Sequence, residues 1–382
     1  MRNVRVKYVR VAESADFIAM ANGLLAAYRS EAFPIRMVFF SSPDNNDSFC
    51  LQRAQIYDVV RQKYGDRSPV VSYVAQKPLD GCSMVLEVHE IFLGKEDCLA
   101  YKQCNNFPYI VLTGKEGRSL FLGAVWGADA NDPVQKQSEE IFSQIQQILD
   151  QEQMPVNTIV RQWNYLERIT GFEGDEQRYQ AFNDARSLFY AQTEWPQGYP
   201  SATGIGTRRG GIQVSLQTYL PKEGEKLPVA LDNRLQIAAH SYSQQVLLGE
   251  TNNRLKTKTT PKFERAKLLF TPSGKLVYIS GTAAIRGEAS LVDADIRHQT
   301  LATLENIEHL ISSDSQRLAG IQHPTTARIT GCRVYVKHPE DWEDCKAVVS
   351  QRYPDLPVVY IEADICRTEL LVEIEGIAFL ND

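Results

Sequence analysis

The sequence predicts an α/β fold made of two similar lobes, each a mixed β-sheet backed by helices. Two segments, 120–149 and 277–311, read alike: an apolar strand-like run meets small residues, and a polar loop and an amphipathic helix follow. In both helices the apolar residues recur on one face, as they do when a helix packs on a core. These residues are Phe142, Ile145 and Ile148 in the first segment, and Leu304, Ile307 and Leu310 in the second.

The likeness continues beyond these helices, element by element. A strand-like run, a helix-like run, a run that follows a proline and a last strand come in the same order, so that β, α, β, α, β, β occurs twice. The matched pairs are 158–167 with 328–337, 179–190 with 342–353, 200–206 with 357–363, and 214–217 with 372–375. Because a sheet must bury its apolar face, two such units predict two sheets covered by helices.

The segments outside the repeat carry weaker signals. Before residue 119 the pattern favours strands at 37–41, 70–74, 84–89 and 109–112, and a helix at 51–63. We interpret them as an extension that leads into the first lobe. Residues 220–262 are polar and rich in lysine. The predicted organisation is therefore a first lobe with its extension at 1–220, a connection at 221–261, and a second lobe at 262–382.

Composition argues against several classes of function. The 382 residues carry a net charge of −6, and basic residues cluster only briefly, at 208–209 and 256–262. A nucleic-acid groove needs a concentrated basic face, so we expect no nucleic-acid partner. No run reaches the roughly 18 apolar residues of a membrane helix, and no signal peptide opens the chain. We therefore expect no membrane partner and a cytoplasmic protein.

The seven cysteines and six histidines indicate neither a disulfide framework nor a metal site. No CxxC, HxH or HxxxH spacing occurs, and the cysteine count is odd. Reduced cytosolic thiols fit this pattern best. The sequence therefore predicts no metal and no cofactor.

The second repeat resembles the Rid (YjgF) family, whose lobes have a chorismate mutase-like fold. The resemblance rests on residues 277–282, 299–300, 306–307 and 371–378 and covers about 262–382. Rid imine deaminases place an arginine fifteen residues before the glutamate of the last matching strand, to hold the substrate carboxylate. Here that position is Val358. The resemblance therefore implies the fold without simple imine deamination.

Longer motifs are similar to those of the chorismatases, which are fused double-Rid enzymes that remove pyruvate from chorismate. They lie at 161–165, 178–186, 199–206, 263–266 and 363–376. The resemblance implies that the substrate is chorismate or a similar small dicarboxylate, and that the product is a hydroxybenzoate or a dihydroxycyclohexadiene carboxylate. Two alternatives stay open: a non-catalytic Rid-type binding or regulatory protein, and a Rid-like deaminase of another substrate. Rid trimers have clefts between subunits, so an oligomer is possible, and fused copies could form a cleft within one chain.

Glu373 is the candidate catalytic residue. Alternation along 370–377 places Glu373 and Glu375 on one strand face, where the first repeat has Ser215 and Gln217, so the fold itself does not require carboxylates there. A solvated strand face is the alternative interpretation. By the resemblance, Glu373 is the chorismatase acid that protonates the enol ether. An apolar cleft would keep it protonated by raising its pKa.

Arginines are the candidate ligands for the two carboxylates of chorismate, because a guanidinium binds a carboxylate through two parallel hydrogen bonds. The family motifs favour Arg186 and Arg265, and Arg161 less strongly. Arg161 shares a strand face with Tyr165. Tyr165 and Tyr242 could donate to a carboxylate or a ring hydroxyl, or simply pack in the core.

Small residues complete the predicted site. Thr203 and Gly204 lie in a run that lacks the phosphate-loop pattern, so its glycines favour a close backbone approach to a ligand. Gly281 and Ala283 keep the floor of the pocket small. Cys366 precedes Glu373 by seven residues and has no matched base, which favours a buried apolar role. In the family, a cysteine there accompanies formation of 3-hydroxybenzoate.

Overall fold

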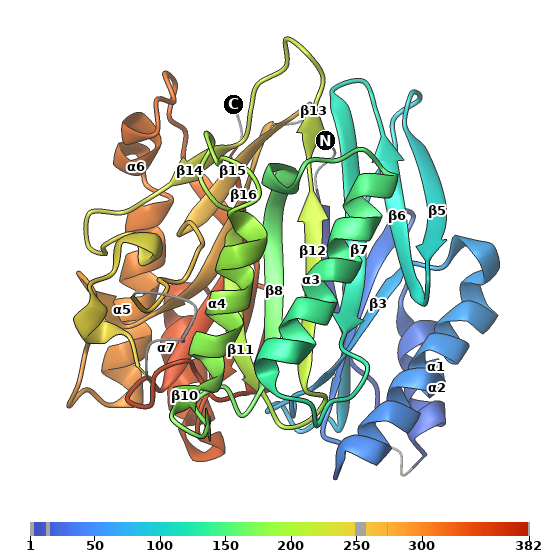
Figure 1. The fold of residues 1–382 in the computed structure, drawn as a ribbon, viewed down its shortest axis with the longest axis horizontal. Coiled ribbons are helices and arrows are strands. Elements are labelled where there is room, and N and C mark those ends of the chain that lie inside the picture. Colours follow the sequence, from blue (N-terminus) through green and yellow to red (C-terminus); the bar gives the residue numbers. More distant parts are fainter. Residues whose placement is uncertain (1–3, 13–15, 249–256, 273, 381–382) are drawn as a thin grey trace.

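The computed structural model describes residues 4–12, 16–248, 257–272 and 274–380 and contains three main sheets with helices outside them (Figure 1). These mixed sheets backed by helices confirm the predicted α/β class. No helix among the described residues is long and apolar enough to cross a membrane. Cys50, Cys98, Cys104, Cys332, Cys345 and Cys366 are free thiols.

The N-terminal unit is a four-stranded sheet with two helices. Side-chain caps begin both helices: Asp16 accepts a hydrogen bond from the amide of Ala19, and Asn45 accepts one from the amide of Ser48. Its elements are β1 (Val4–Val9), α1 (Phe17–Ala27), β2 (Phe33–Ser41), α2 (Asn46–Tyr64), η1 (Gly65–Arg67), β3 (Val70–Ala75) and β4 (Met84–Ile91).

The central unit adds a hairpin and a short edge strand to the same plan. Its helix α3 buries the apolar face that the sequence predicts, with Phe142, Ile145 and Ile148 in the core. Its elements are β5 (Cys98–Cys104), β6 (Phe107–Thr113), β7 (Gly117–Trp126), α3 (Val134–Gln151), η2 (Val156–Thr158), β8 (Ile159–Glu167), β9 (Phe172–Glu173), β10 (Glu176–Gln177), α4 (Arg178–Tyr190), β11 (Ser201–Thr207), β12 (Ile212–Thr218) and β13 (Leu220–Pro221).

The C-terminal unit has a six-stranded sheet, and its helix α5 buries the matching face with Leu304, Ile307 and Leu310. The connection expected at 221–261 holds β14, η3 and η4, and its residues 249–256 lie outside the described chain. The elements are β14 (Val229–Leu231), η3 (Ala239–Ser241), η4 (Gln244–Val246), β15 (Ala266–Thr271), β16 (Gly274–Ala283), β17 (Ile285–Arg286), β18 (Ala289–Ser290), α5 (Ile296–Leu310), α6 (Ser313–Leu318), β19 (Ala327–Val336), η5 (Pro339–Asp341), α7 (Trp342–Arg352), β20 (Val358–Glu362) and β21 (Val372–Leu380).

The βαβαββ plan occurs three times, once more than the sequence repeat shows. The sheet orders β3-β2-β4-β1, β11-β8-β12-β7 and β20-β19-β21-β16 correspond strand by strand. In each, the first pair is parallel and the other two pairs are antiparallel. Residues 4–91, expected to be an extension, are therefore a unit in themselves. Its strands β3 and β4 are buried at every position, so they lack the alternation that marks a half-exposed strand.

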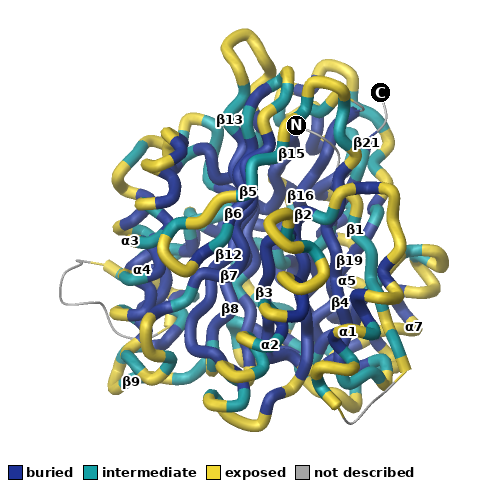
Figure 2. The backbone as a smooth tube through the Cα atoms, turned by 90° about the vertical axis from the view of Figure 1, so that its right-hand side faces the viewer, coloured by how far each residue is buried: buried dark blue, intermediate teal, exposed yellow. Residues whose placement is uncertain are grey.

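The three units pack in a closed cycle with their strands inside. Strand β3 packs against β7, β11 packs against β16, and β1 packs against β19. Figure 2 shows the buried strands in the interior and the exposed segments around the rim. Each unit therefore has one interface with each of the other two.

An arginine occupies the same register position in all three units. Arg36 lies opposite His89 in the N-terminal sheet, Arg161 opposite Gln217 in the central sheet, and Arg333 opposite Glu375 in the C-terminal sheet. All three arginines are at most 3% exposed. A buried guanidinium needs acceptors, so each must find partners where the units meet.

Arg333 ties the N-terminal unit to the other two. It donates from Nε to Glu87 Oε2 at 3.0 Å and from Nη2 to Glu87 Oε1 at 2.5 Å. It also donates from Nη1 to the hydroxyls of Tyr335 at 2.8 Å and Tyr165 at 2.9 Å, and lies 3.2 Å from Glu375 Oε1. This network joins residues of all three sheets in the interior.

Removing Arg333 should destabilise the whole chain. We expect Arg333→Met to lower the free energy of unfolding by about 3–5 kcal/mol, because it leaves Glu87 buried without its arginine. Arg328→Met is the matched control, since Arg328 is an exposed arginine on the same strand. It should change the value by about 0.5 kcal/mol or less. Urea unfolding of the two variants makes the comparison, and equal losses would show that the buried network contributes nothing special.

Candidate active site

One cavity lies between the central and C-terminal units. It is bounded by α4 and β11 on one side and by β16 and the start of β21 on the other, and its empty volume is about 740 Å³, part of it open to solvent. Among the residues singled out from the sequence, those that line it are Gly204, Tyr242, Arg265, Gly281, Ala283, Cys366 and Glu373. Residues from both repeats thus meet at one interface.

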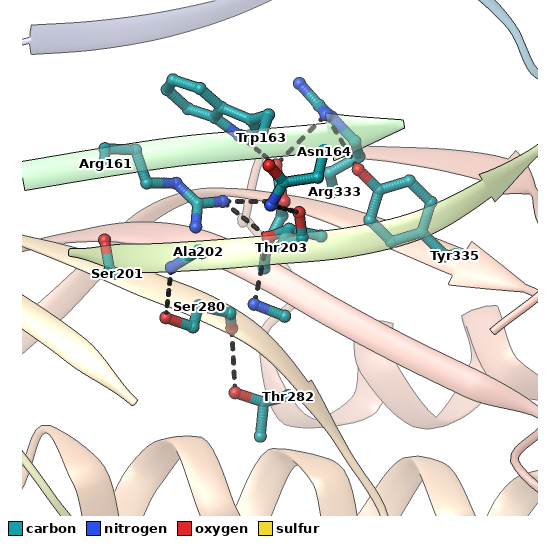
Figure 3. Close-up of polar contacts among 12 residues, drawn as sticks. Arg161, Trp163, Asn164, Ser201, Ala202, Thr203, Ser280, Thr282, Arg333 and Tyr335 are labelled. Atoms are coloured by element: carbon teal, nitrogen blue, oxygen red, sulfur yellow. Dashed lines mark hydrogen bonds and ion pairs between the residues drawn. The ribbon is translucent and has the colours of Figure 1, made fainter. Parts of the chain in front are cut away.

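The absence of a side chain at Gly281 leaves the space that the Glu373 carboxyl occupies. A Cβ at position 281 would lie 2.0 Å from Glu373 Oε1, so with any side chain at 281 the Glu373 carboxyl would have to move. Strands β11 and β16 run close together here: the amide of Gly281 donates to Thr203 Oγ1 at 3.1 Å, and the amide of Ala202 donates to Ser280 Oγ at 2.9 Å (Figure 3). The glycine at 281 is therefore a packing requirement of the acid.

Glu373 is buried, and within the part of the chain that the structure describes it has no ion-pair partner. It lies opposite Ala283 and Tyr335 in the sheet and is 5% exposed. The pKa of Glu373 is raised to about 8, mainly by burial and next by the neighbouring Glu375 carboxylate, while Arg161 and Arg265 act in the opposite direction. Glu373 is therefore a carboxylic acid at neutral pH and has a proton to give.

Glu375, two residues further along the strand, is in the opposite state. It accepts hydrogen bonds from Arg161 Nη2 at 2.8 Å and from Trp163 Nε1 at 2.9 Å. Burial opposes ionisation of Glu375, but Arg333 and Arg161 outweigh it, so its pKa lies below the ordinary value. Adjacent carboxyls whose pKa values are pushed apart are typical of sites that move protons.

Arg265 is a cation that faces the cavity with donor capacity to spare. It donates from Nη2 to the Tyr242 hydroxyl at 2.6 Å and to the carbonyl of Ile237 at 2.8 Å. Its Nε has no partner among the described residues. The pair Arg265 and Tyr242 can therefore present a charged group and a hydroxyl to an anionic ligand.

Arg186 lies behind the cavity rather than on its wall. It is fully buried and donates from Nη2 to Asn183 Oδ1 at 2.6 Å, and Asn183 lines the cavity. Within the described chain its Nε and Nη1 have no hydrogen-bond partner. The structure thus places this arginine one side chain away from the space that a ligand would occupy.

Arg161, Thr203 and Tyr165 belong to the interior network and not to the cavity wall. Arg161 donates to Thr203 Oγ1 at 2.7 Å (Figure 3) and also to Glu375. The Tyr165 hydroxyl accepts from Arg333. The strand face predicted for Arg161 and Tyr165 is real, but it points at the packed centre of the molecule. For Tyr165 the packing alternative describes the position that the structure shows.

Several lining residues were not among the predicted ones. Tyr179, Gln180 and Asn183 lie on α4, within the motif 178–186 that carried the resemblance, so a helix-face argument could have found them. Val246, Leu247 and Phe263 come from the irregular segment before β15, where no periodicity marks the inward side chains. Arg367 lines the cavity beside Cys366.

Comparisons with known proteins bear on the family resemblance. Residues 105–217 match the protein-family model described as chorismatase FkbO/Hyg5-like, N-terminal, and residues 266–380 match that of endoribonuclease L-PSP. A 3-hydroxybenzoate synthase of Streptomyces hygroscopicus is 33% identical over 239 residues, which are 59% of this chain and 65% of that protein. A chorismatase of Streptomyces rapamycinicus is 30% identical over 227 residues, which are 58% of this chain and 64% of that protein.

The chain therefore matches less than two thirds of the length of these curated relatives. A solved chorismatase structure superposes with a TM-score of 0.72 at 20% identity, over 98% of both chains, which shows a shared fold. These findings confirm the resemblance to chorismatases and to the Rid domain.

A methyl group at position 281 should compete with the Glu373 carboxyl for the same space. We expect Gly281→Ala to lower the free energy of unfolding by about 1–3 kcal/mol, the usual cost of overpacking. In a Glu373→Ala background most of that loss should vanish, because the clashing oxygen is gone. Gly331→Ala is the control, since its nearest neighbour would lie at an ordinary 3.6 Å. A loss that is the same in both backgrounds would contradict the packing argument.

Proposed function

We propose that this protein removes pyruvate from chorismate, with Glu373 as the acid that protonates the methylene carbon of the enol ether. The observation that carries the proposal is a buried carboxyl that is neutral at physiological pH and faces a cavity beside an arginine. A site that only bound a dicarboxylate would gain nothing from a proton donor. The similarity to a 3-hydroxybenzoate synthase and to chorismatases supports the same substrate.

The chemistry needs one proton at carbon and one site for a transient cation. Proton transfer from Glu373 converts the enol ether into an oxocarbenium ion, and the new carboxylate lies next to that cation and stabilises it. Addition of water to the cation gives a hemiketal, which collapses to pyruvate and a ring alcohol. Alternatively, the bond between the ring carbon and the ether oxygen breaks, pyruvate leaves, and the ring returns one proton to the Glu373 carboxylate as it rearranges to a hydroxybenzoate.

The two carboxylates of the substrate need fixed donors. Arg265 and Tyr242 supply a guanidinium and a hydroxyl on the cavity wall, and Arg367 lines the cavity near Cys366. Arg186 adds positive charge from behind Asn183. Charge-assisted hydrogen bonds of this kind contribute about 1.5–3 kcal/mol each.

For the alternative, Rid-type imine deamination, the chain lacks the arginine that would hold the substrate carboxylate. Val358 begins β20 and pairs with Cys332 of β19, so no guanidinium occupies that position. Burial raises the pKa of the Cys366 thiol to about 12, so at neutral pH it is a small neutral group beside the acid and not a nucleophile.

Replacing the acid should separate catalysis from binding. Glu373→Gln keeps the shape but has no transferable proton, so we expect pyruvate release from chorismate to fall roughly 10²–10⁴-fold. Chorismate affinity, measured by calorimetry, should survive. Glu343→Gln, at an exposed position on α7, is the control and should keep the wild-type rate. Full activity in Glu373→Gln would assign the acid role to another group, and a wild-type protein that releases no pyruvate would reject the substrate.

The rate should also depend on pH in one direction. The reaction needs the protonated form of Glu373, so kcat/KM should be full below the pKa of about 8 and should fall as pH rises through it. Lys267 also has a pKa lowered to about 8 by burial, but its ammonium donates to the carbonyls of residues 197–199 and does not line the cavity. Lys267→Arg should therefore keep the same profile, and a limb that moved with it would assign the titration to that lysine.

A further inference from the structure

The three unit interfaces can be compared at one position. In each unit, one residue of the neighbouring strand pairs with the position two residues after the arginine. This residue is Glu87 in the N-terminal unit, Ser215 in the central unit and Glu373 in the C-terminal unit. Arg36 donates to Ser215 at 2.9 Å, across the first interface. Arg333 donates to Glu87 across another. Each of these arginines thus binds the residue that corresponds to Glu373 in the next unit.

Arg161 breaks this pattern. The corresponding residue in its next unit is Glu373, yet Arg161 donates to Glu375 at 2.8 Å. At the position of Glu375 the other units carry Gln217 and His89. Burial lowers the pKa of His89, so that ring is neutral. Only the C-terminal unit therefore offers a carboxylate at this position to attract the arginine.

We propose that Glu375 is a positioning residue that holds Arg161 away from Glu373, so that Glu373 keeps the proton it transfers. The inference rests on the proposed function of Glu373 as the acid. Without Glu375, the free guanidinium would turn to Glu373 in the way that Arg333 binds Glu87. Glu373 would then be ionised and would have no proton to give.

The charges around Glu373 agree with this role. Glu375 lies on the same strand, Arg161 approaches from β8, and Arg265 approaches from the segment before β15. Tyr179 of α4 and Cys366 are neutral, because burial raises the pKa of both. Arg367 lines the same cavity.

Two of the three buried arginines are paired with carboxylates other than Glu373. Arg161 and Arg333 face the carboxylates of Glu375 and Glu87. The third, Arg36, donates to Ser215 at another interface. None of the three is paired with Glu373, and this favours the neutral form of its carboxyl.

The test is the pH dependence of Glu375→Gln. The basic limb of kcat/KM for pyruvate release should move to lower pH by about one unit or more, because a like charge is lost and an arginine is freed. Glu87→Gln is the matched control: it removes the other carboxylate of the same network but leaves the pair of Arg161 and Glu375. Its limb should stay in place, whatever it does to stability. If the basic limb of the pH profile did not move in either variant, or moved equally in Glu375→Gln and Glu87→Gln, the proposal would be overturned.

Adding Arg161→Met to Glu375→Gln should return the limb toward the wild-type pH, since no arginine then reaches Glu373. A purely structural role for Glu375 would show no such rescue. The infrared band of a protonated carboxyl gives a readout that needs no substrate. At pH 7 the wild type should show a band that Glu373→Gln removes and that Glu375→Gln weakens.

Absence of the band in the wild type would overturn the inference even if Glu375→Gln failed to fold. Should the wild type release no pyruvate, the proposed function fails, while the infrared comparison still decides the role of Glu375.

Discussion

The buried arginine of each unit is the constraint on which the rest of the structure depends. A guanidinium in the interior must be met by acceptors, and its own sheet cannot supply them all. Arg36, Arg161 and Arg333 therefore reach into the next unit, to Ser215, Glu375 and Glu87. The three sheets are tied together at their centre by these contacts, and the apolar packing of strands against helices surrounds them.

The site arises because one interface departs from the other two. At the other two interfaces, Arg36 and Arg333 bind the residues that correspond to Glu373, Ser215 and Glu87, so a direct contact fills that place. At the third interface Arg161 binds Glu375, two residues further along the strand, and Glu373 is left beside a cavity. The carboxylate of Glu375 thus takes the arginine, and Glu373 is left without a cationic partner among the described residues and keeps its proton.

The same region shows how small residues serve chemistry. Gly281 makes room for the Glu373 carboxyl. The hydroxyl of Thr203 accepts hydrogen bonds from the amide of Gly281 and from the guanidinium of Arg161. The backbone of Gly281 and the guanidinium of Arg161 are therefore fixed relative to one another beside the acid. Preorganisation of this kind means that little structure has to move at the moment of proton transfer.

The sequence by itself determined the α/β class, two of the three units, and the strand face that carries Glu373 and Glu375, because alternation and helical periodicity are local properties of the chain. It also predicted part of the cavity wall, including Gly281 on β16, Glu373 on β21 and Arg265. It did not show the third unit, since β3 and β4 are buried on both faces and carry no alternation. Nor could it decide which arginines face the ligand: Arg265 lines the cavity, Arg186 stands behind it, and Arg161 is taken by Glu375. That choice depends on which residue of another unit each arginine meets, and such partners are set only when the three sheets pack together.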